Sequence, residues 1–587
     1  MNRTTIESSP LTTKALGRTT ALLTALCLIS VVLFLGLTPF NTRGEPREAI
    51  VAYSMLQDSN WILPVNNGDE IAFKPPLLHW LVALLSTLSG HITEFTARLP
   101  SALAATAMVV ATFRFFAHRR DESVALLAAL LTLTNFEVHR AAMTCRVDML
   151  LSALIVMGLY DLYRWYERGL HGTPWAAWLC LAGAALTKGP VGIVLPCGAA
   201  AVFYWLRGKG FWSVCWRLAL LAIASLIPLL LWYWAAYHEP HGGERFLRLI
   251  YEENILRFTG QMSYASHINP WYYNVTSVLA GFLPYSLLAL FGTCCLRWHR
   301  TTGKFSDGVR TLPSRALEGL RNLPPTKLFA FVCPVIIFVF YCIPASKRSV
   351  YLLPLYPFVA YWLAEFFVWL SRRHRCAVSA FGWTMAVLAF ILTVAFIVVR
   401  LDGAPASLFS GKHADENLAF VHALRDIPLT WVAVILVLLP AAAGAWCLRQ
   451  VKRPVALWGT VGIVFCVHLA LSGFYLPTVL SVKSDRAVAE RIAAIVPEGR
   501  IYSYRTDVLE ANRMHPFTIN FYLGDRIIPI DKASEAPQSG YLVAGNDDVE
   551  TFRKVYPQYA VSLVYDSQHR SCDDHKTTRL YRFALHP

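Results

Sequence analysis

Charged and polar residues are concentrated where long apolar segments of this sequence end. They include the acidic and basic side chains that enzyme reactions use. The first group is Arg43-Gly44-Glu45-Pro46-Arg47-Glu48-Ala49, and Phe73-Lys74-Pro75-Pro76 follows a short way downstream. The prolines keep the backbone at Lys74 extended, so its ammonium group projects from a stiff segment. A second carboxylate, Asp148, comes directly after Cys145-Arg146-Val147 at the mouth of another apolar segment.

This combination of cations and carboxylates beside apolar segments suits a lipid-linked phosphate. Arginine grips a phosphate through two parallel hydrogen bonds, whereas lysine acts on it as a point charge. A carboxylate can take the proton of an acceptor hydroxyl as general base. The same cations stabilise a phosphate leaving group as negative charge develops on it. The residue types therefore indicate glycosyl transfer from a polyprenyl phosphate.

The candidate catalytic bases are Glu45 and Asp148. The side chains predicted to bind the donor phosphate or the substrate are Arg47, Lys74, Arg146, Lys188, Glu253, Asn254, Arg257, Lys347 and Tyr351. Lys74, Arg257 and Lys347 are expected to hold the donor phosphate, because three separate stretches bring them to one face. Structural explanations stand beside these roles: Asp148 can cap the helix that follows it, and Lys188 can extend to the membrane interface.

Membrane-spanning helices are the elements that must position these groups. Of the 587 residues, 55% are hydrophobic and 16% are charged, whereas a soluble protein carries about 25% charged residues. About thirteen membrane-spanning helices are predicted, because about thirteen apolar runs approach the roughly 20 residues that cross a bilayer. They cover residues 19–40, 99–116, 124–136, 149–163, 175–186, 191–205, 212–237, 272–296, 328–343, 351–370, 378–399, 429–447 and 455–474. The 13 cysteines show no metal-binding spacing.

The loops between these runs predict the orientation. The formal charge of +15 does not indicate a nucleic-acid partner, since the basic residues cluster in short alternate loops, as cytoplasmic loops do. Residues 1–18 are therefore predicted to be cytoplasmic, residues 19–480 to form the transmembrane domain, and residues 41–98 to be its first outer loop. Within that loop, residues 45–69 predict a helix on the membrane surface followed by a turn, and residues 77–88 a second interfacial or re-entrant helix.

Residues 481–587 differ from the rest of the chain and predict a small α/β domain. Residues 486–495 have helical spacing, and residues 548–555 also favour a helix. Short strands are predicted at residues 500–504, 527–530, 540–544, 560–565 and 580–583. This domain is expected outside the cytoplasm, on the same face as the candidate site.

Several motifs occur in a characteristic order along the chain. They are Gly44-Glu45-Pro46-Arg47-Glu48-Ala49, Met55-Leu56, Asn60-Trp61-Ile62-Leu63-Pro64, Phe73-Lys74-Pro75-Pro76-Leu77 with His79-Trp80, Thr187-Lys188-Gly189-Pro190, Glu253-Asn254-Ile255-Leu256-Arg257-Phe258, Pro270-Trp271-Tyr272-Tyr273 and Lys347-Arg348-Ser349-Val350-Tyr351-Leu352-Leu353-Pro354. Together they resemble the membrane glycosyltransferases of the protein O-mannosyltransferase superfamily, closest to the bacterial lipid A aminoarabinose transferases.

The resemblance implies a polytopic α-helical fold of the GT-C type with a small extracytoplasmic α/β domain. It implies a multi-pass protein of the bacterial cytoplasmic (inner) membrane, with the active site and the C-terminal domain on the periplasmic side. The implied reaction is inverting transfer of a sugar, such as 4-amino-4-deoxy-L-arabinose, from undecaprenyl phosphate to lipid A or a related envelope acceptor. The alternatives are transfer to Ser or Thr of a protein, and transport of a lipid-linked sugar without catalysis. The implied partners are this donor, this acceptor and membrane lipid, with no nucleic acid.

Two positions depart from the pattern of the family. An Asp-Glu pair usually opens the first outer loop there, but here Gly44 stands at the Asp position, which leaves Glu45 or Asp148 as the base. In the aminoarabinose branch the residue before the Lys-Pro motif is often a Glu that, with a His, is associated with a bound metal. Here that residue is Phe73, although His267 is similar to the His. No cofactor or metal is therefore predicted, and dependence on a divalent cation is left open.

Overall fold

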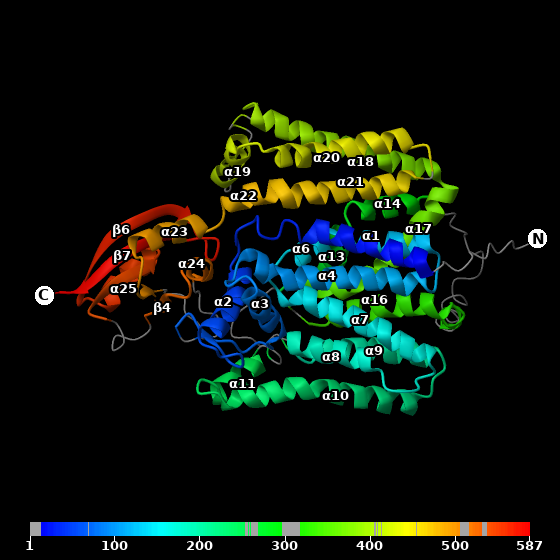
Figure 1. Ribbon diagram of the computed structural model, residues 1–587, viewed down its shortest axis with the longest axis horizontal. Coiled ribbons are helices and arrows are strands. Elements are labelled where there is room, and N and C mark those ends of the chain that lie inside the picture. Colours follow the sequence, from blue (N-terminus) through cyan, green and yellow to red (C-terminus); the bar gives the residue numbers. More distant parts are fainter. Residues whose placement is uncertain are drawn as a thin grey trace, which may run out of the picture.

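A long helical bundle carries a small sheet domain at one end (Figure 1). The computed structural model describes residues 13–68, 70–252, 256, 259, 268–295, 317–344, 346–403, 405, 407, 409–411, 414–453, 455–504, 516–530 and 537–586. The predicted fold class, a polytopic helical membrane protein with a C-terminal α/β domain, is confirmed.

Each of the thirteen predicted apolar runs contains a helix, but the described residues supply eight candidate spans, or up to ten if each bent helix pair is one span, and not the thirteen membrane-spanning helices that the sequence predicted. Eight continuous helical segments in the described part of the chain are long and apolar enough to cross a membrane. They are α1 (Thr13–Val31), α4 (Glu94–Ala117), α10 (Phe211–His238), α16 (Pro325–Cys342), η2 with α17 (Ser349–Leu355, Tyr356–Arg373), α18 (Arg375–Arg400), α20 (Trp431–Gln450), and α21, η4 and α22 (Ala456–Ala470, Leu471–Tyr475, Leu476–Ser481).

The five remaining runs are shorter or bent. Two form helix pairs bent by 115° and 105°, namely α6 with α7 (Phe136–Ala142, Val147–Glu167) and α13 with α14 (Tyr273–Gly281, Tyr285–Thr293). Three form the short helices α5 (Glu122–Leu133), α8 (Trp175–Lys188) and α9 (Val191–Leu206). The sharp bend before α7 matters most, because it brings Arg146 and Asp148 to the end of the bundle.

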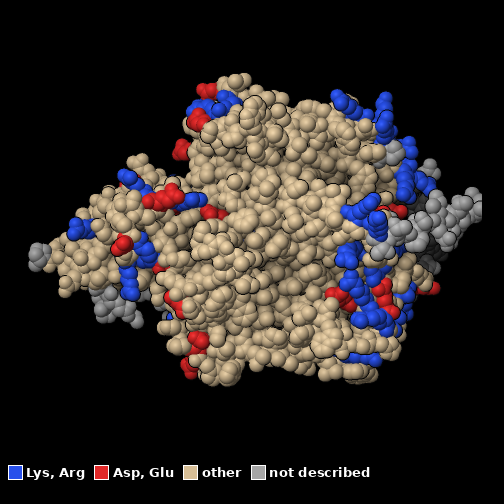
Figure 2. Space-filling view, in the orientation of Figure 1, with Lys and Arg blue, Asp and Glu red and all other residues tan. Residues whose placement is uncertain are grey.

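The two ends of the bundle differ in charge. Figure 2 shows Lys and Arg gathered at the end opposite the sheet domain, whereas acidic and basic side chains are interspersed at the end that carries the sheet domain. In between, the face shown in Figure 2 is almost free of charge. An uncharged belt between two polar ends is what a hydrocarbon environment requires.

The first outer loop contains two helices and a hairpin. Helix α2 (Gly44–Gln57) is followed by the strands β1 (Val65–Asn66) and β2 (Glu70–Ile71) and by α3 (Leu77–Thr87). The predicted helix, turn and second helix are therefore present. However, ten of the 14 residues of α2 are buried, because α2 packs between α3 and helix α24 of the C-terminal domain. The C-terminal domain thus covers α2, and the position of this helix at the membrane surface stays a prediction.

The C-terminal domain is a mixed five-stranded sheet with order β4-β3-β5-β7-β6. Its strands are β3 (Ile501–Ser503), β4 (Ile527–Pro529), β5 (Ser539–Ala544), β6 (Tyr559–Arg570) and β7 (Thr577–Leu585). Strand β3 pairs in parallel with β4 and β5, whereas β5, β7 and β6 are antiparallel. Helices α23 (Arg486–Ile495) and α25 (Asn546–Val555) lie at the predicted places, and α24 (Phe517–Tyr522) was not predicted.

Buried polar contacts fix this domain to the first outer loop. The Tyr522 hydroxyl donates to Glu94 at 2.8 Å and accepts the backbone N–H of Phe40 at 2.9 Å. The Asp525 carboxylate accepts the backbone N–H of Asn67 at 2.9 Å and the Ser54 hydroxyl at 3.2 Å. The domain therefore covers α2.

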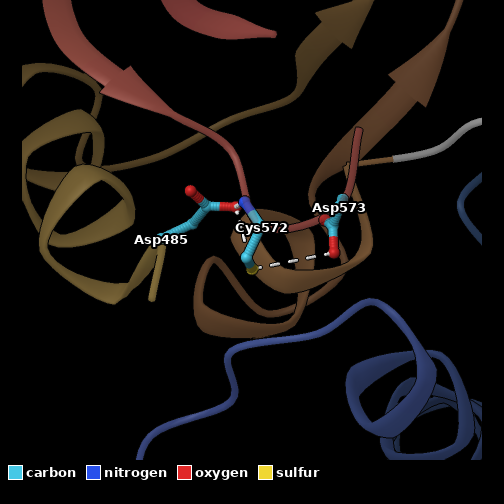
Figure 3. Close-up of side chains that lie close together, drawn as sticks. All are labelled: Asp485, Cys572 and Asp573. Carbon is cyan, nitrogen blue, oxygen red and sulfur yellow. Dashed lines mark hydrogen bonds between the residues drawn. The ribbon is translucent and has the colours of Figure 1, made fainter. Parts of the chain in front are cut away.

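A cluster of Asp485, Cys572 and Asp573 joins the β6–β7 turn to the helices below it (Figure 3). The Asp485 carboxylate accepts the Ser571 hydroxyl at 2.7 Å and the Cys572 backbone N–H at 3.2 Å. The Asp573 carboxylate accepts the hydroxyl and the backbone N–H of Thr518 at 2.7 and 2.8 Å. These hydrogen bonds explain why the three side chains lie together, because they connect the β6–β7 turn to α24 and to Asp485.

The stability of the protein is expected to fall as the pH rises from about 4 to about 7, because of Asp573. Burial raises the pKa of Asp573 from 3.8 to about 7, against the hydrogen bonds from Thr518 that lower it. In this range the folded chain keeps a proton that the unfolded chain has lost, so the free energy of unfolding decreases with pH. Thermal unfolding of the full-length protein at pH 5 and pH 8 measures this effect.

The matched comparison is Asp573→Asn, which cannot titrate, against Asp566→Asn in the same hairpin, where Asp566 is paired with Arg579. The Asp573→Asn protein should have the same Tm at pH 5 and pH 8, whereas the Asp566→Asn protein should show the same difference between the two pH values as the parent. An Asp573→Asn protein whose Tm still changes with pH as in the parent contradicts the assignment.

Candidate active site

Five segments that are far apart in the sequence contact one another near the C-terminal domain. They are α2, the loop before α3, the bend before α7, the end of α8 and the start of η2. The predicted residues Glu45, Arg47, Lys74, Arg146, Asp148, Lys188 and Tyr351 all lie on these segments.

Asp148 and Lys188 form an ion pair between α7 and α8. The Lys188 ammonium lies 2.5 Å from Oδ1 of Asp148 and 4.3 Å from the centre of the Tyr351 ring, so the three predicted residues are brought together. Asp148 does not cap α7, because the N-cap position is Arg146 and no side chain caps this helix. Among the described residues, no hydrogen bond to Oδ2 of Asp148 is present, whereas Oδ1 binds Lys188.

Glu45, the other predicted base, has no such free oxygen. Its two carboxylate oxygens accept from Nε and Nη2 of Arg98 at 2.8 and 3.0 Å, and Oε1 also accepts the backbone N–H of Cys145 at 2.9 Å. The exposed fractions of Glu45 and Arg98 are 4% and 3%. Arg98 also donates to the carbonyls of Leu35 and Thr38. This buried pair holds the start of α2 against α4 and against the segment that follows α1.

Glu48 is a site residue that the sequence reasoning missed. Its buried carboxylate lies 2.5 Å from the Lys74 ammonium, 3.0 Å from Nε2 of His79 and 3.3 Å from Nη2 of Arg47. Burial acts to raise the pKa of Glu48, but Lys74, His79 and Arg47 together hold that pKa well below its usual range. Glu48 is therefore ionised, and its ion pair with Lys74 fixes the position of that ammonium group. The signal was its place in the motif that opens the first outer loop.

Gly44 leaves room for the Arg146 guanidinium. A Cβ atom at position 44 would lie 1.6 Å from Nη2 of Arg146. The side chain of Arg146 thus occupies the space that any other residue at position 44 would fill. Besides Asp148, the charged side chains that act on Arg146 are Arg348, Arg47 and Glu48, with Arg348 the strongest. The sequence alone showed only the missing Asp, and not that an arginine takes its place.

The other predicted residues are less well connected to this group. Lys347 is buried, with 7% exposure, and its carbonyl accepts from Asn269. Glu253, Asn254, Arg257 and His267 lie outside the described residues. The metal associated with the aminoarabinose branch has no ligand atom at Phe73, and Lys74 and His79 already occupy the carboxylate of Glu48. The described residues therefore do not fit that metal, and no step is assigned to one.

Comparisons with known proteins agree with this description. Residues 73–234 match the family described as dolichyl-phosphate-mannose-protein mannosyltransferase. An uncharacterized protein of Aquifex aeolicus is 27% identical over 524 residues, which are 88% of this chain and 89% of that protein. The undecaprenyl phosphate-alpha-4-amino-4-deoxy-L-arabinose arabinosyl transferase 2 of Proteus mirabilis is 24% identical over 395 residues, or 65% of each chain. The chain thus spans just under two thirds of the length of that transferase.

The fold is similar to that of ArnT from Cupriavidus metallidurans bound to undecaprenyl phosphate. The TM-score is 0.66 at 19% identity, and the match covers 97% of this chain and 98% of that one. The expected resemblance to membrane glycosyltransferases of the protein O-mannosyltransferase superfamily is confirmed by these matches, and so is the predicted class of enzyme.

Proposed function

We propose that this membrane glycosyltransferase moves a sugar from undecaprenyl phosphate to lipid A or a related envelope glycolipid. The proposal is carried by two ion pairs at one end of the bundle, Asp148 with Lys188 and Glu48 with Lys74. The C-terminal domain covers this end. The similarity to the Proteus transferase and to ArnT supports 4-amino-4-deoxy-L-arabinose as the sugar and undecaprenyl phosphate as its carrier.

In the proposed reaction, Asp148 is the general base. An acceptor oxygen attacks the anomeric carbon from the side opposite the phosphate, and its proton passes to the carboxylate of Asp148. The bond between the anomeric carbon and the phosphate oxygen breaks, and its electron pair stays on the phosphate. Lys74, Arg257 and Lys347 are proposed to hold the donor phosphate, where cations stabilise the charge that develops. The configuration at the anomeric carbon is inverted.

The orientation follows from the charges. The basic end of the bundle is proposed to face the cytoplasm, because cytoplasmic loops carry the excess of Lys and Arg. The active site and the C-terminal domain then face the periplasm. A transporter would place its binding groups near the middle of the bilayer, whereas Asp148 and Lys188 lie in the first turn of α7 and the last turn of α8, and Glu48 lies in the first outer loop. This distribution favours the enzyme over the transporter.

The test is a transfer assay with the purified protein in lipid nanodiscs, undecaprenyl phosphate-linked aminoarabinose and lipid A. Mass spectrometry should find lipid A heavier by one sugar and one equivalent of free undecaprenyl phosphate. Lipid A from cells with and without the protein should differ in the same way. Unmodified lipid A together with glycosylated Ser or Thr residues would favour a protein acceptor. Movement of the donor between leaflets without release of undecaprenyl phosphate would favour a transporter.

A further inference from the structure

A fully buried carboxylate of the C-terminal domain, that of Asp485, has one oxygen that accepts no hydrogen bond from the described residues. Asp485 stands at the N-cap position of α23, but the described chain shows no capping hydrogen bond from its side chain. Its Oδ2 accepts from Ser571 and Cys572. Its Oδ1 lies 3.3 Å from Nε2 of His569, a buried nitrogen that also lacks a hydrogen-bond partner in the described part of the chain. Two buried polar atoms left in this way are costly unless something else binds them.

The Cys572 sulfur contacts the carboxylates of Asp485 and Asp573 (Figure 3). It lies 3.3 Å from Oδ2 of Asp485, 3.3 Å from the Thr518 hydroxyl oxygen and 3.9 Å from Oδ1 of Asp573. A thiol has a single proton, so it can donate to only one of these three oxygens. Ligand atoms of Asp485, Cys572 and Asp573 all lie within 4.8 Å of one another, which is close enough for one ion to bind all three.

The two carboxylates also bring negative charge that no described basic side chain neutralises. Asp485 and Asp573 are 0% and 7% exposed, and no described lysine or arginine forms an ion pair with either of them. Buried charges in proteins are paired or bind a metal. Without a metal, a proton on Asp573 lowers this charge, and the pH dependence of Tm expected for Asp573 applies to that metal-free form. A bound metal displaces such protons.

The kinds of ligand atom indicate zinc. Zn²⁺ binds Cys sulfur at about 2.3 Å, His nitrogen at about 2.0–2.1 Å and Asp oxygen at about 2.0–2.2 Å. A tetrahedral site with these bond lengths places its ligand atoms roughly 3.3–3.6 Å apart. The distances of 3.3 Å from Asp485 to His569 and to Cys572 agree with this spacing. Ca²⁺ and Mg²⁺ take oxygen ligands, so the thiol and the imidazole disfavour them.

We propose that the C-terminal domain contains a structural zinc site formed by Asp485, His569, Cys572 and Asp573. On binding, the proton of the Cys572 thiol passes to the solvent and the thiolate binds the ion. The ion connects the start of α23 to the end of β6 and to the β6–β7 turn. Asp573 is also hydrogen-bonded to Thr518 of α24, the helix that packs against α2. Zinc therefore stabilises the domain that covers the first outer loop, in a different domain from the metal associated with the aminoarabinose branch.

The experiment measures the zinc bound to the full-length protein in detergent. The purified protein is treated with a chelator, incubated with Zn²⁺, desalted and analysed by inductively coupled plasma mass spectrometry. The parent should retain one more zinc ion per chain than the ligand variants Cys572→Ser, Asp485→Asn and His569→Gln. The matched controls are Cys466→Ser in α21 and Asp566→Asn in β6, and both should retain as much zinc as the parent. The comparison with variants cancels any zinc that binds elsewhere on the protein.

Two measurements on the parent do not depend on the folding of a ligand variant. Zn²⁺ should raise the Tm of the chelator-treated protein, because it binds the folded state, whereas Mg²⁺ should leave the Tm unchanged. Zn²⁺ should also slow the alkylation of Cys572, which peptide mapping by mass spectrometry reports.

A further variant, Thr518→Val, keeps every ligand but removes the hydroxyl that donates to Asp573. It should weaken zinc binding roughly 10- to 100-fold, the effect of losing a partner that orients a metal ligand. Equal zinc contents in the parent and in all three ligand variants overturn the site. So does alkylation of Cys572 that Zn²⁺ does not slow, because the thiolate would then not be bound to the ion.

Discussion

Replacing Asp148 with Asn is expected to lower the turnover number roughly 10²- to 10⁴-fold, the usual contribution of a general base, while the protein stays folded. Asparagine keeps the shape of the side chain and can still accept a hydrogen bond from Lys188, but it cannot take a proton. The Lys188 side chain is 30% exposed, so solvent can stabilise its charge when its partner is lost. Single-turnover transfer from undecaprenyl phosphate-linked sugar to lipid A measures the effect.

The control is Asp161→Asn on the same helix, where Asp161 pairs with Arg164 one turn along and faces solvent in part. That variant should turn over like the parent, because an ion pair of this kind contributes only about 0.3–0.5 kcal/mol. A further readout is the pH profile, whose acidic limb should disappear in Asp148→Asn. If turnover of this variant stays within about tenfold of the parent, the loss is too small for a general base.

Replacing Glu45 with Gln is expected to destabilise the protein by roughly 3–5 kcal/mol, the cost of leaving one member of a buried ion pair without its partner. The Arg98 guanidinium is 3% exposed and meets both oxygens of Glu45. Glutamine supplies only one acceptor oxygen and no charge. Thermal unfolding of the purified protein in detergent, together with the yield of folded protein, measures the loss.

A double variant separates this structural role from a catalytic one. Glu45→Met with Arg98→Met removes both buried charges, so it should be more stable than either single variant. If Glu45→Gln instead unfolds at the same temperature as the parent and has lost about 10²-fold or more in turnover, then Glu45 is the base. Loss of the Asp148 carboxylate is thus expected to lower the turnover number, whereas loss of the Glu45 carboxylate is expected to lower the stability of the protein.

The sequence by itself determined the architecture, because hydropathy and strand patterns are local properties. Each of the thirteen apolar runs contains a helix, and the predicted helix at residues 486–495 coincides with α23 (Arg486–Ile495). The five predicted strands of the C-terminal domain are all present. The alternation of basic loops also followed from the sequence, and it appears as the basic end of the bundle in Figure 2. The sequence also identified Glu45 and Asp148 as candidates for the general base, since each lies at the end of an apolar run.

Only the tertiary structure distinguished the two carboxylates. Glu45 meets Arg98 across 53 residues of sequence, and Asp148 meets Lys188 across 40. A motif cannot show which oxygens such distant partners occupy. The same holds for Gly44, which looked like a missing catalytic residue until Arg146 was found against it. It also holds for α2, which packs against a domain that begins more than 400 residues later in the chain. The pairing of charges depends on which segments the fold brings together, and the order of residues within one segment does not contain that information.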